Sequence, residues 1–157
     1  MIITDKFTRK LRDVRISVTD RCNFRCTYCM PKEVYDSNYK FFNKKEILSF
    51  EEIIRLTRIL ASLGVRKVRL TGGEPLLRNN IHVLIQKIKE IEGITDISMT
   101  TNGVLLSKKK AILLKNSGLS RLTVSLDSLN NKRFREISGS NYLPQDVLSG
   151  IDNAKKA

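Results

Sequence analysis

The chain has 157 residues, of which 41% are hydrophobic and 29% charged, and this composition suits one folded domain and excludes a disordered segment. Its 29 lysines and arginines against 16 acidic residues give a formal net charge of +13. Such an excess attracts anions, which include nucleic acid, nucleotide phosphates and acidic membranes. Nucleic acid is not the expected partner, because no aromatic-rich strand of the RNA-binding type accompanies the basic residues.

The first residues show no apolar stretch of the signal-peptide type, and no apolar run in the sequence reaches the length of a membrane span. We therefore expect a cytoplasmic protein without a membrane association. Cysteine thiols stay reduced in that compartment.

The first half of the chain predicts strand, loop, helix and strand in that order. Apolar and polar residues alternate over residues 13–19, which predicts a strand. Ser49 and Glu52 form a capping box that opens a helix, and Gly64 marks its end. A second strand is predicted over residues 65–71.

The second half repeats this alternation. An apolar stripe over residues 81–91 predicts a helix, and residues 94–100 are predicted to form a strand. A second helix with an exposed lysine-rich start is predicted over residues 107–117. A fourth strand is predicted over residues 119–126, and a helical pattern follows it to the end of the sequence. Strands that alternate with helices predict a parallel sheet with right-handed crossovers. The fold class is therefore α/β, and either a doubly wound sheet or part of a barrel fits.

Four short motifs follow directly after the four predicted strands. They are the cysteine loop (residues 19–31), the G-G-E-P loop (72–75), the T-N-G loop (101–103) and the L-D-S loop (126–128). Each has a structural interpretation as a tight turn, and Asp127 could cap the next helix. Glu74 alternatively offers an acceptor to a bound ammonium or hydroxyl group. Because the carboxyl ends of parallel strands share one edge, we expect the four loops to form one functional surface.

All three cysteines lie in the sequence C-N-F-R-C-T-Y-C at residues 22–29. An odd number of cysteines argues against a disulfide framework. A structural zinc site needs a fourth ligand, and the single histidine, His82, falls in a predicted helix where solvation is the simpler interpretation. Three thiolates fit a four-iron cluster better, because such clusters take about one thiolate per iron and one iron then stays open for chemistry.

Two strand arginines, Arg15 and Arg69, are each flanked by apolar neighbours. Their side chains must therefore point away from the apolar side of the sheet, either to solvent or into a barrel lumen. An arginine inside the lumen near the active-site end can bind an anion.

The cysteine motif, with Cys22, Cys26 and Cys29, resembles the three-cysteine signature of the radical S-adenosylmethionine (SAM) superfamily, and T-G-G-E-P resembles its motif for the methionine end of SAM. Together with V-R-I-S-V-T-D-R-C, T-T-N-G and V-S-L-D-S-L, these motifs resemble the GTP 3′,8-cyclase family along essentially the whole chain. The resemblance implies a partial TIM-type barrel with about four βα units of a (βα)6 radical SAM core.

The same resemblance implies a radical SAM lyase of molybdenum cofactor biosynthesis, with a [4Fe–4S] cluster and SAM as cofactors. The three cysteines would hold the cluster, SAM would bind its open iron, and a 5′-deoxyadenosyl radical would start the conversion of GTP to 3′,8-cyclo-7,8-dihydro-GTP. An electron donor would be needed, and a homodimer stays open. By position, the implied SAM contacts are Tyr28, Gly73 and Ser125, and the implied GTP contacts are Arg15, Arg69 and Thr100.

The sequence departs from this family after about four βα units, because the family core has six and its cyclases carry a second cluster on three further cysteines. No cysteine follows Cys29 here. We therefore expect residues 1–157 to be the N-terminal portion of a radical SAM core domain. Two other functions stay open: a peptide-modifying radical SAM maturase, and a non-catalytic module that binds metal or nucleic acid.

Overall fold

The computed structural model describes residues 3–157, which form one parallel sheet with strands in the sequential order β1-β2-β3-β4. The strands are β1 (Asp13–Ser17), β2 (Lys67–Thr71), β3 (Asp96–Thr101) and β4 (Arg121–Val124). The helices are α1 (Phe50–Ser62), α2 (Ile81–Lys89), α3 (Lys108–Asn116), α4 (Asn131–Ser138) and α5 (Pro144–Lys155), with a short 3-10 helix η1 (Pro75–Leu77).

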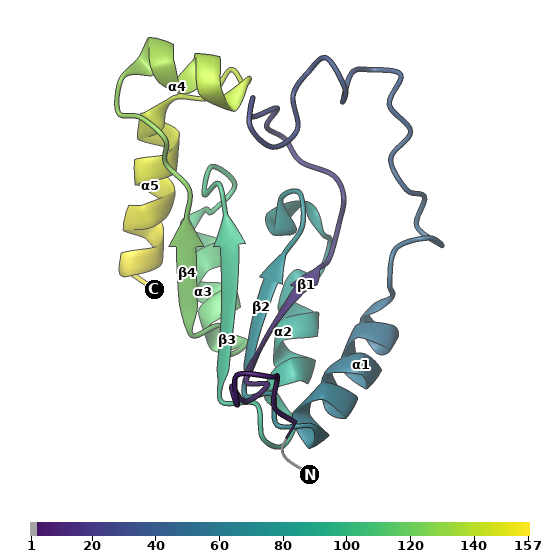
Figure 1. The fold of residues 1–157 in the computed structure, drawn as a ribbon. Helices are drawn as coiled ribbons and strands as arrows, with labels where there is room; N and C mark the ends of the chain where they lie inside the picture. The colour runs from purple at the N-terminus through teal and green to yellow at the C-terminus, as the bar shows by residue number, and fades with distance from the viewer. Residues whose placement is uncertain (1–2) are drawn as a thin grey trace.

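The helices decide between the two predicted architectures. In Figure 1, α2 and α3 lie behind the sheet, α1 lies next to α2 at the β1 edge, α5 lies beside β4 and α3, and the opposite sheet face carries no helix among residues 3–157. A doubly wound sheet has helices on both faces, whereas a barrel has them on the outside only. The described residues therefore form an open arc of a barrel, and we call its helix-free side the inner face.

Alternation along the strands separates apolar from polar side chains. The side that faces the helices carries buried residues such as Val68, Leu70 and Met99, which pack with Leu84 and Ile85 of α2 in the main core. The alternate residues of each strand lie on the inner face, and all of them are polar. Its residues are Asp13, Arg15, Ser17, Lys67, Arg69, Thr71, Asp96, Ser98, Thr100, Arg121, Thr123 and Ser125.

The predicted elements are present, with shorter strands than the alternation suggested. The capping box of α1 is confirmed: Ser49 Oγ accepts a hydrogen bond from the Glu52 N–H at 3.2 Å, and a Glu52 carboxylate oxygen accepts from the Ser49 N–H at 2.7 Å. Asp127 does not take the alternative role of helix cap, because Asn130 caps α4 by accepting from the Arg133 N–H at 3.0 Å. None of the helices in the described part of the chain has the length and hydropathy needed to cross a membrane.

A smaller apolar cluster attaches the cysteine loop to α4. The Phe24 ring meets the buried Phe134 ring edge-on, with 6.0 Å between their centroids. The Arg25 N–H donates to the carbonyl oxygen of Ser138 at 2.8 Å, and the Thr27 N–H donates to that of Ile137 at 3.0 Å. The last carbonyl groups of a helix need such external donors, so the end of α4 and the cysteine loop satisfy each other's backbone groups.

We predict that Phe134→Ala lowers the free energy of unfolding by about 3–5 kcal/mol, because it removes a fully buried ring beneath the cysteine loop. Urea unfolding followed by circular dichroism measures this loss. Phe42→Ala is the matched control, since the Phe42 ring is exposed and its loss is expected to cost under about 0.5 kcal/mol. Equal losses in the two variants would contradict this account of the cluster.

Candidate cofactor site

The motif loops meet at the carboxyl ends of the strands, as predicted. The Gly73 N–H donates to the carbonyl oxygen of Thr19 at 2.7 Å, and the Glu74 N–H donates to that of Arg21 at 2.8 Å. The G-G-E-P loop therefore lies directly against the cysteine loop, backbone to backbone.

This close approach explains the two glycines. A Cβ atom at Gly73 would lie 2.2 Å from the carbonyl oxygen of Arg21, and one at Gly72 would lie 2.4 Å from that of Thr19. Gly72 also has a φ of +143°, which L side chains rarely adopt. Any larger residue at either position would push the two loops apart.

The Glu74 carboxylate is buried, with 1% of the residue exposed, and it connects the G-G-E-P loop to the T-N-G loop. It accepts hydrogen bonds from Thr101 Oγ1 at 2.7 Å, from the Asn102 N–H at 2.8 Å and from the Leu76 N–H at 2.9 Å. Burial raises the pKa of Glu74, while these hydrogen bonds and the charge of Lys110 oppose that rise. Three of the acceptor positions of the Glu74 carboxylate are therefore used inside the protein.

The three cysteines are free thiols on one loop; Cys22 and Cys26 are half-buried and Cys29 is exposed. Cys22 Sγ accepts a hydrogen bond from the Phe24 N–H at 3.3 Å. Burial raises the pKa of Cys22, and it raises the pKa of Cys26 to about 11. Negative charge on Glu74 and Cys29 adds to the rise in the pKa of Cys22, and negative charge on Cys22, Asp127 and Cys29 adds to the rise in the pKa of Cys26.

Three free thiols on one loop are the type of donor set that an iron–sulfur cluster takes. Within residues 3–157, no three cysteine, histidine or acidic side chains converge as one metal ion would require. A cluster takes its thiolates at separate irons. Two buried polar atoms beside Cys22 in the sequence, Asp20 Oδ1 and Asn23 Nδ2, have no hydrogen-bond partner in the described residues, and a polar group bound by this loop could satisfy them.

Tyr28 joins the cysteine loop to the L-D-S loop. Its hydroxyl group donates to the Asp127 carboxylate, with 3.1 Å and 3.2 Å to the two oxygens. Tyr28 is 66% exposed as a residue, so it is accessible to a ligand. Asp127, which does not cap a helix, thus holds a residue of the cysteine motif over the end of β4.

Strand register brings the two predicted arginines together on the inner face. Arg15 pairs with Arg69, Arg69 with Ser98, and Ser98 with Arg121, so these four residues form one row across the sheet. Together with Asp13, Val14 and Lys67, this row lines a hollow of 170 Å³. Arg121 was missed at the sequence level, although it has the same phase in its strand; Asp96 forms an ion pair with it.

Hydroxyl groups form the next row toward the loops. Ser17 pairs with Thr71 and Thr100 pairs with Thr123, and Ser125, whose N–H donates to the carbonyl oxygen of Thr101 at 3.0 Å, follows at the end of β4. The predicted substrate contact Thr100 and the predicted SAM contact Ser125 therefore lie between the arginine row and the motif loops.

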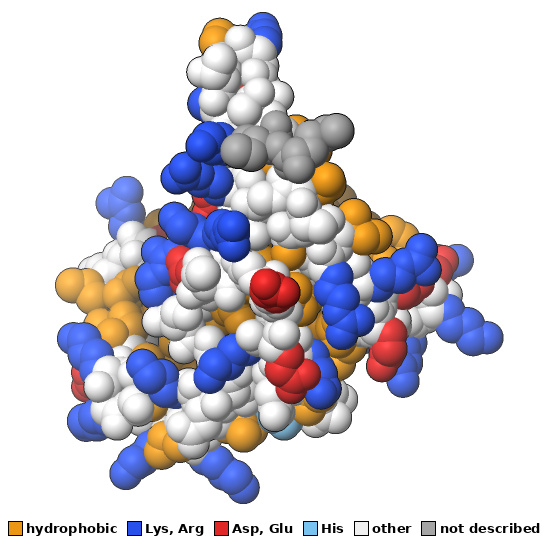
Figure 2. Space-filling view, turned by 90° about the horizontal axis from the view of Figure 1, so that it is seen from below, with side chains coloured by type: hydrophobic (Ala, Val, Ile, Leu, Met, Phe, Trp, Pro, Cys, Tyr) orange, Lys and Arg blue, Asp and Glu red, His pale blue; other side chains and the backbone are white. Residues whose placement is uncertain are grey.

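Figure 2, which views the opposite end of the strands, shows lysines and arginines spread widely with fewer acidic side chains between them.

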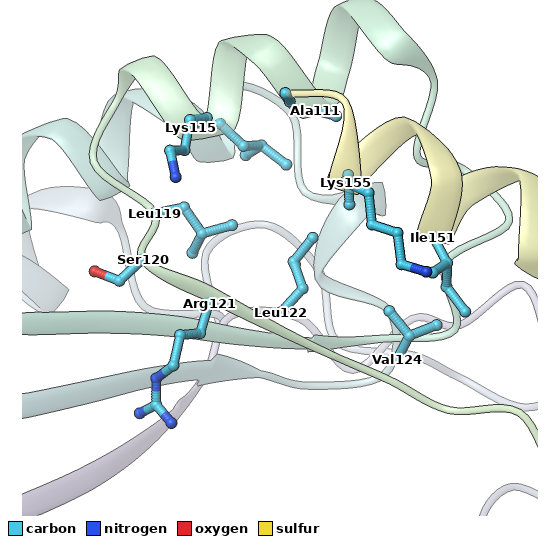
Figure 3. Close-up of a pocket in the computed structure, with 12 residues that line it drawn as sticks. Ala111, Lys115, Leu119, Ser120, Arg121, Leu122, Val124, Ile151 and Lys155 are labelled. Carbon is cyan, nitrogen blue, oxygen red and sulfur yellow. The ribbon is translucent and has the colours of Figure 1, made fainter.

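A second hollow lies outside this site. Figure 3 shows it between β4, α3 and α5, with Leu119, Leu122, Val124 and Ile151 around it and Lys115 and Lys155 at its border. It contains no residue of the four motif loops, and of the arginine row it touches only Arg121. We therefore do not count it as part of the cofactor site.

Residues 16–157 match the radical SAM superfamily. The chain belongs to this superfamily. Its match covers all four motif loops and leaves out only the residues before the middle of β1. The superfamily's cofactors, a [4Fe–4S] cluster and SAM, are the two that the motifs predict, and the residues that would hold them stay predictions.

The curated relatives of this chain indicate a narrower family than the superfamily match does. GTP 3′,8-cyclase of Staphylococcus haemolyticus is 53% identical over 152 residues, which cover 97% of this chain and 44% of the relative. The enzyme of Staphylococcus aureus strain JH9 is 50% identical over the same share of both chains. The chain thus spans less than half the length of these relatives.

Solved structures support the fold. SuiB of Streptococcus suis bound to S-adenosylmethionine matches 92% of this chain and 31% of its own, with a TM-score of 0.73 and 23% identity. HydG, a maturase of the [FeFe]-hydrogenase, matches 92% of this chain and 32% of its own, with a TM-score of 0.73 and 16% identity. At these identities the likeness confirms the partial barrel and says nothing about substrate.

Glu74→Gln is expected to lower the free energy of unfolding by about 2 kcal/mol or more, because an amide cannot accept from all three donors that the carboxylate satisfies. Urea unfolding at neutral pH measures this. The control is Glu92→Gln, a swap at an exposed position, which should change stability by under about 0.5 kcal/mol.

The pH dependence of unfolding in the wild type and in Glu74→Gln tests the pKa of Glu74. Because burial raises its folded-state pKa above the usual value of 4.5, the native protein holds the proton more tightly than the unfolded chain. The contribution of Glu74 to stability must then fall as the pH rises from 4.5 through the folded pKa. The wild-type decline over this window should be weaker in Glu74→Gln, and an identical pH profile in both proteins would contradict the raised pKa.

Proposed function

We propose that this chain carries the SAM-binding half of a GTP 3′,8-cyclase, and that residues 1–157 are the N-terminal portion of a radical SAM core domain. The observation that carries the proposal is the identity of 50–53% to GTP 3′,8-cyclases over 97% of the chain. The reading frame beyond codon 157 tests the domain assignment, which requires further strand–helix units there.

In this proposal Cys22, Cys26 and Cys29 hold a [4Fe–4S] cluster through three irons. Cluster and SAM, when bound, supply one-electron reductive chemistry that no amino-acid side chain provides. An external electron donor is part of the proposal. Burial keeps the thiols of Cys22 and Cys26 protonated in the free protein, so cluster binding must release protons from them.

SAM is assigned to the surface made by the motif loops. Tyr28 offers an exposed ring at the cysteine loop, while Gly73 lets the G-G-E-P backbone lie against that loop without a side chain between them. Ser125 lies on the inner-face phase just after β4. These residues come from three loops that the structure already links by hydrogen bonds, so the site needs little rearrangement to bind a ligand.

GTP is assigned to the inner face below these loops. Arg15 and Arg69 lie in register on neighbouring strands, and guanidinium groups bind phosphate oxygens through paired hydrogen bonds. Thr100 adds a hydroxyl group in the adjacent row. The substrate would therefore lie between the arginine row and the cofactor loops, where a hydrogen atom of its sugar can face SAM.

Anaerobic reconstitution with iron and sulfide should give a [4Fe–4S] cluster whose reduced EPR spectrum changes when SAM is added. Replacing any one of Cys22, Cys26 and Cys29 by Ala should abolish the stoichiometric cluster, because three thiolates are the minimum that leaves a single open iron. Zinc in place of iron, or a cluster that is indifferent to SAM, would contradict the proposal.

Arg15→Ala and Arg69→Ala should each weaken GTP binding by about tenfold or more, since each removes a charged hydrogen-bond donor to phosphate. Isothermal titration calorimetry of the reconstituted protein measures the affinity. Arg58→Ala removes an exposed arginine on the outer helix α1 and is the control for net charge. Equal losses in all three variants would indicate a general charge effect and not a site.

A further inference from the structure

We propose that Asn23 is a further residue of the cluster site: its unpaired side-chain N–H donates a hydrogen bond to a sulfur of the cluster held by Cys22, Cys26 and Cys29. This inference rests on the cluster binding proposed above. It assigns a function to a residue inside the cysteine motif that is not itself a ligand.

A chain of hydrogen bonds holds Asn23 in place. The buried Glu74 carboxylate fixes the backbone of Asn102, and the Asn102 side chain donates from Nδ2 to Asn23 Oδ1 at 2.8 Å. Asn102 is itself 8% exposed. The G-G-E-P, T-N-G and cysteine loops are thus joined through side chains as well as through the backbone contacts of Gly73 and Glu74.

These hydrogen bonds also determine which end of the Asn23 amide has no partner. The Val104 N–H donates to Asn102 Oδ1 at 3.3 Å, which makes the Asn102 Nδ2 the group that faces Asn23. A donor from Asn102 requires the oxygen of Asn23 as its acceptor. The nitrogen of Asn23 is therefore the free end of the amide.

That nitrogen is buried and has no acceptor within residues 3–157. A buried N–H without a partner costs about 1–3 kcal/mol, so native structures rarely leave one. Asn23 directly follows Cys22, and the next residue, Phe24, already donates its N–H to Cys22 Sγ at 3.3 Å. One donor of this loop thus already meets a sulfur, and a cluster at the cysteines would supply the acceptor that Asn23 lacks.

Such a hydrogen bond has a measurable electronic effect. Reduction adds negative charge to the cluster, and a donor to sulfur stabilises the reduced form more than the oxidised form. Asn23 would therefore shift the reduction potential of the cluster in the positive direction. A purely structural asparagine would leave the potential unchanged.

The first measurement uses the wild-type chain after anaerobic reconstitution, with asparagine labelled by ¹⁵N in the side chain. Pulsed EPR of the reduced cluster should detect a ¹⁵N coupling, and this coupling should disappear in Asn23→Asp. Asn23→Asp keeps the oxygen that accepts from Asn102, replaces the N–H donor by a second oxygen and adds a carboxylate, and the uncharged Asn23→Leu used below separates the loss of the donor from the added charge. A wild-type cluster without a ¹⁵N coupling would overturn the inference, whatever the folding of the variant.

The second measurement is a redox titration of the cluster without SAM. Asn23→Asp and the uncharged Asn23→Leu should both shift the potential to more negative values. The control is Asn43→Asp, an exposed position where the oxygen likewise accepts a backbone N–H, from Lys45 at 2.9 Å. Potentials equal to that of Asn43→Asp in both Asn23 variants would overturn the inference.

Different results would contradict the proposed function and the proposed role of Asn23. If no cluster assembles on the wild-type chain, the proposed function fails and the inference with it. If the cluster assembles and responds to SAM but shows neither coupling nor potential shift, only the role of Asn23 is wrong.

Discussion

The site depends on one buried carboxylate. Glu74 places a potential negative charge among the ends of β2 and β3, and such a group is tolerated in an interior only when donors surround it. Thr101, Asn102 and Leu76 supply those donors from two loops that are far apart in the sequence. Because the cost of leaving the carboxylate unpaired is high, the two loops hold a single relative position.

The other contacts of the site build on that position. The backbone of the G-G-E-P loop, held by Glu74, pairs with the cysteine loop, and two glycines allow the approach. The far side of the cysteine loop is held by Phe134 and the end of α4. Three thiols on an irregular loop are therefore supported from both sides, as a geometrically demanding cofactor requires.

The sheet separates two kinds of chemistry by the phase of its strands. One phase is buried against the helices, and the other places a row of arginines and a row of hydroxyl groups on a surface that no described helix covers. A row of like charges on neighbouring strands is unfavourable without a compensating anion. Asp96 compensates Arg121, whereas Arg15 and Arg69 have no ion pair within residues 3–157, which agrees with the proposal that they bind an anionic substrate.

The sequence by itself determined the local features. The capping box at Ser49, the strand–helix alternation, the grouping of motifs after strands and the three-cysteine pattern are all set by neighbours within a few residues, and each could be read without a structure. The strand–helix alternation left a doubly wound sheet and a barrel arc open, because it allows helices on either face; the resemblance of the motifs predicted the barrel arc, and the tertiary structure confirmed it. The tertiary structure alone showed the partners of Glu74, Asn23 and Asp127: these lie 27, 79 and 99 residues away, and only packing shows which donor meets which acceptor.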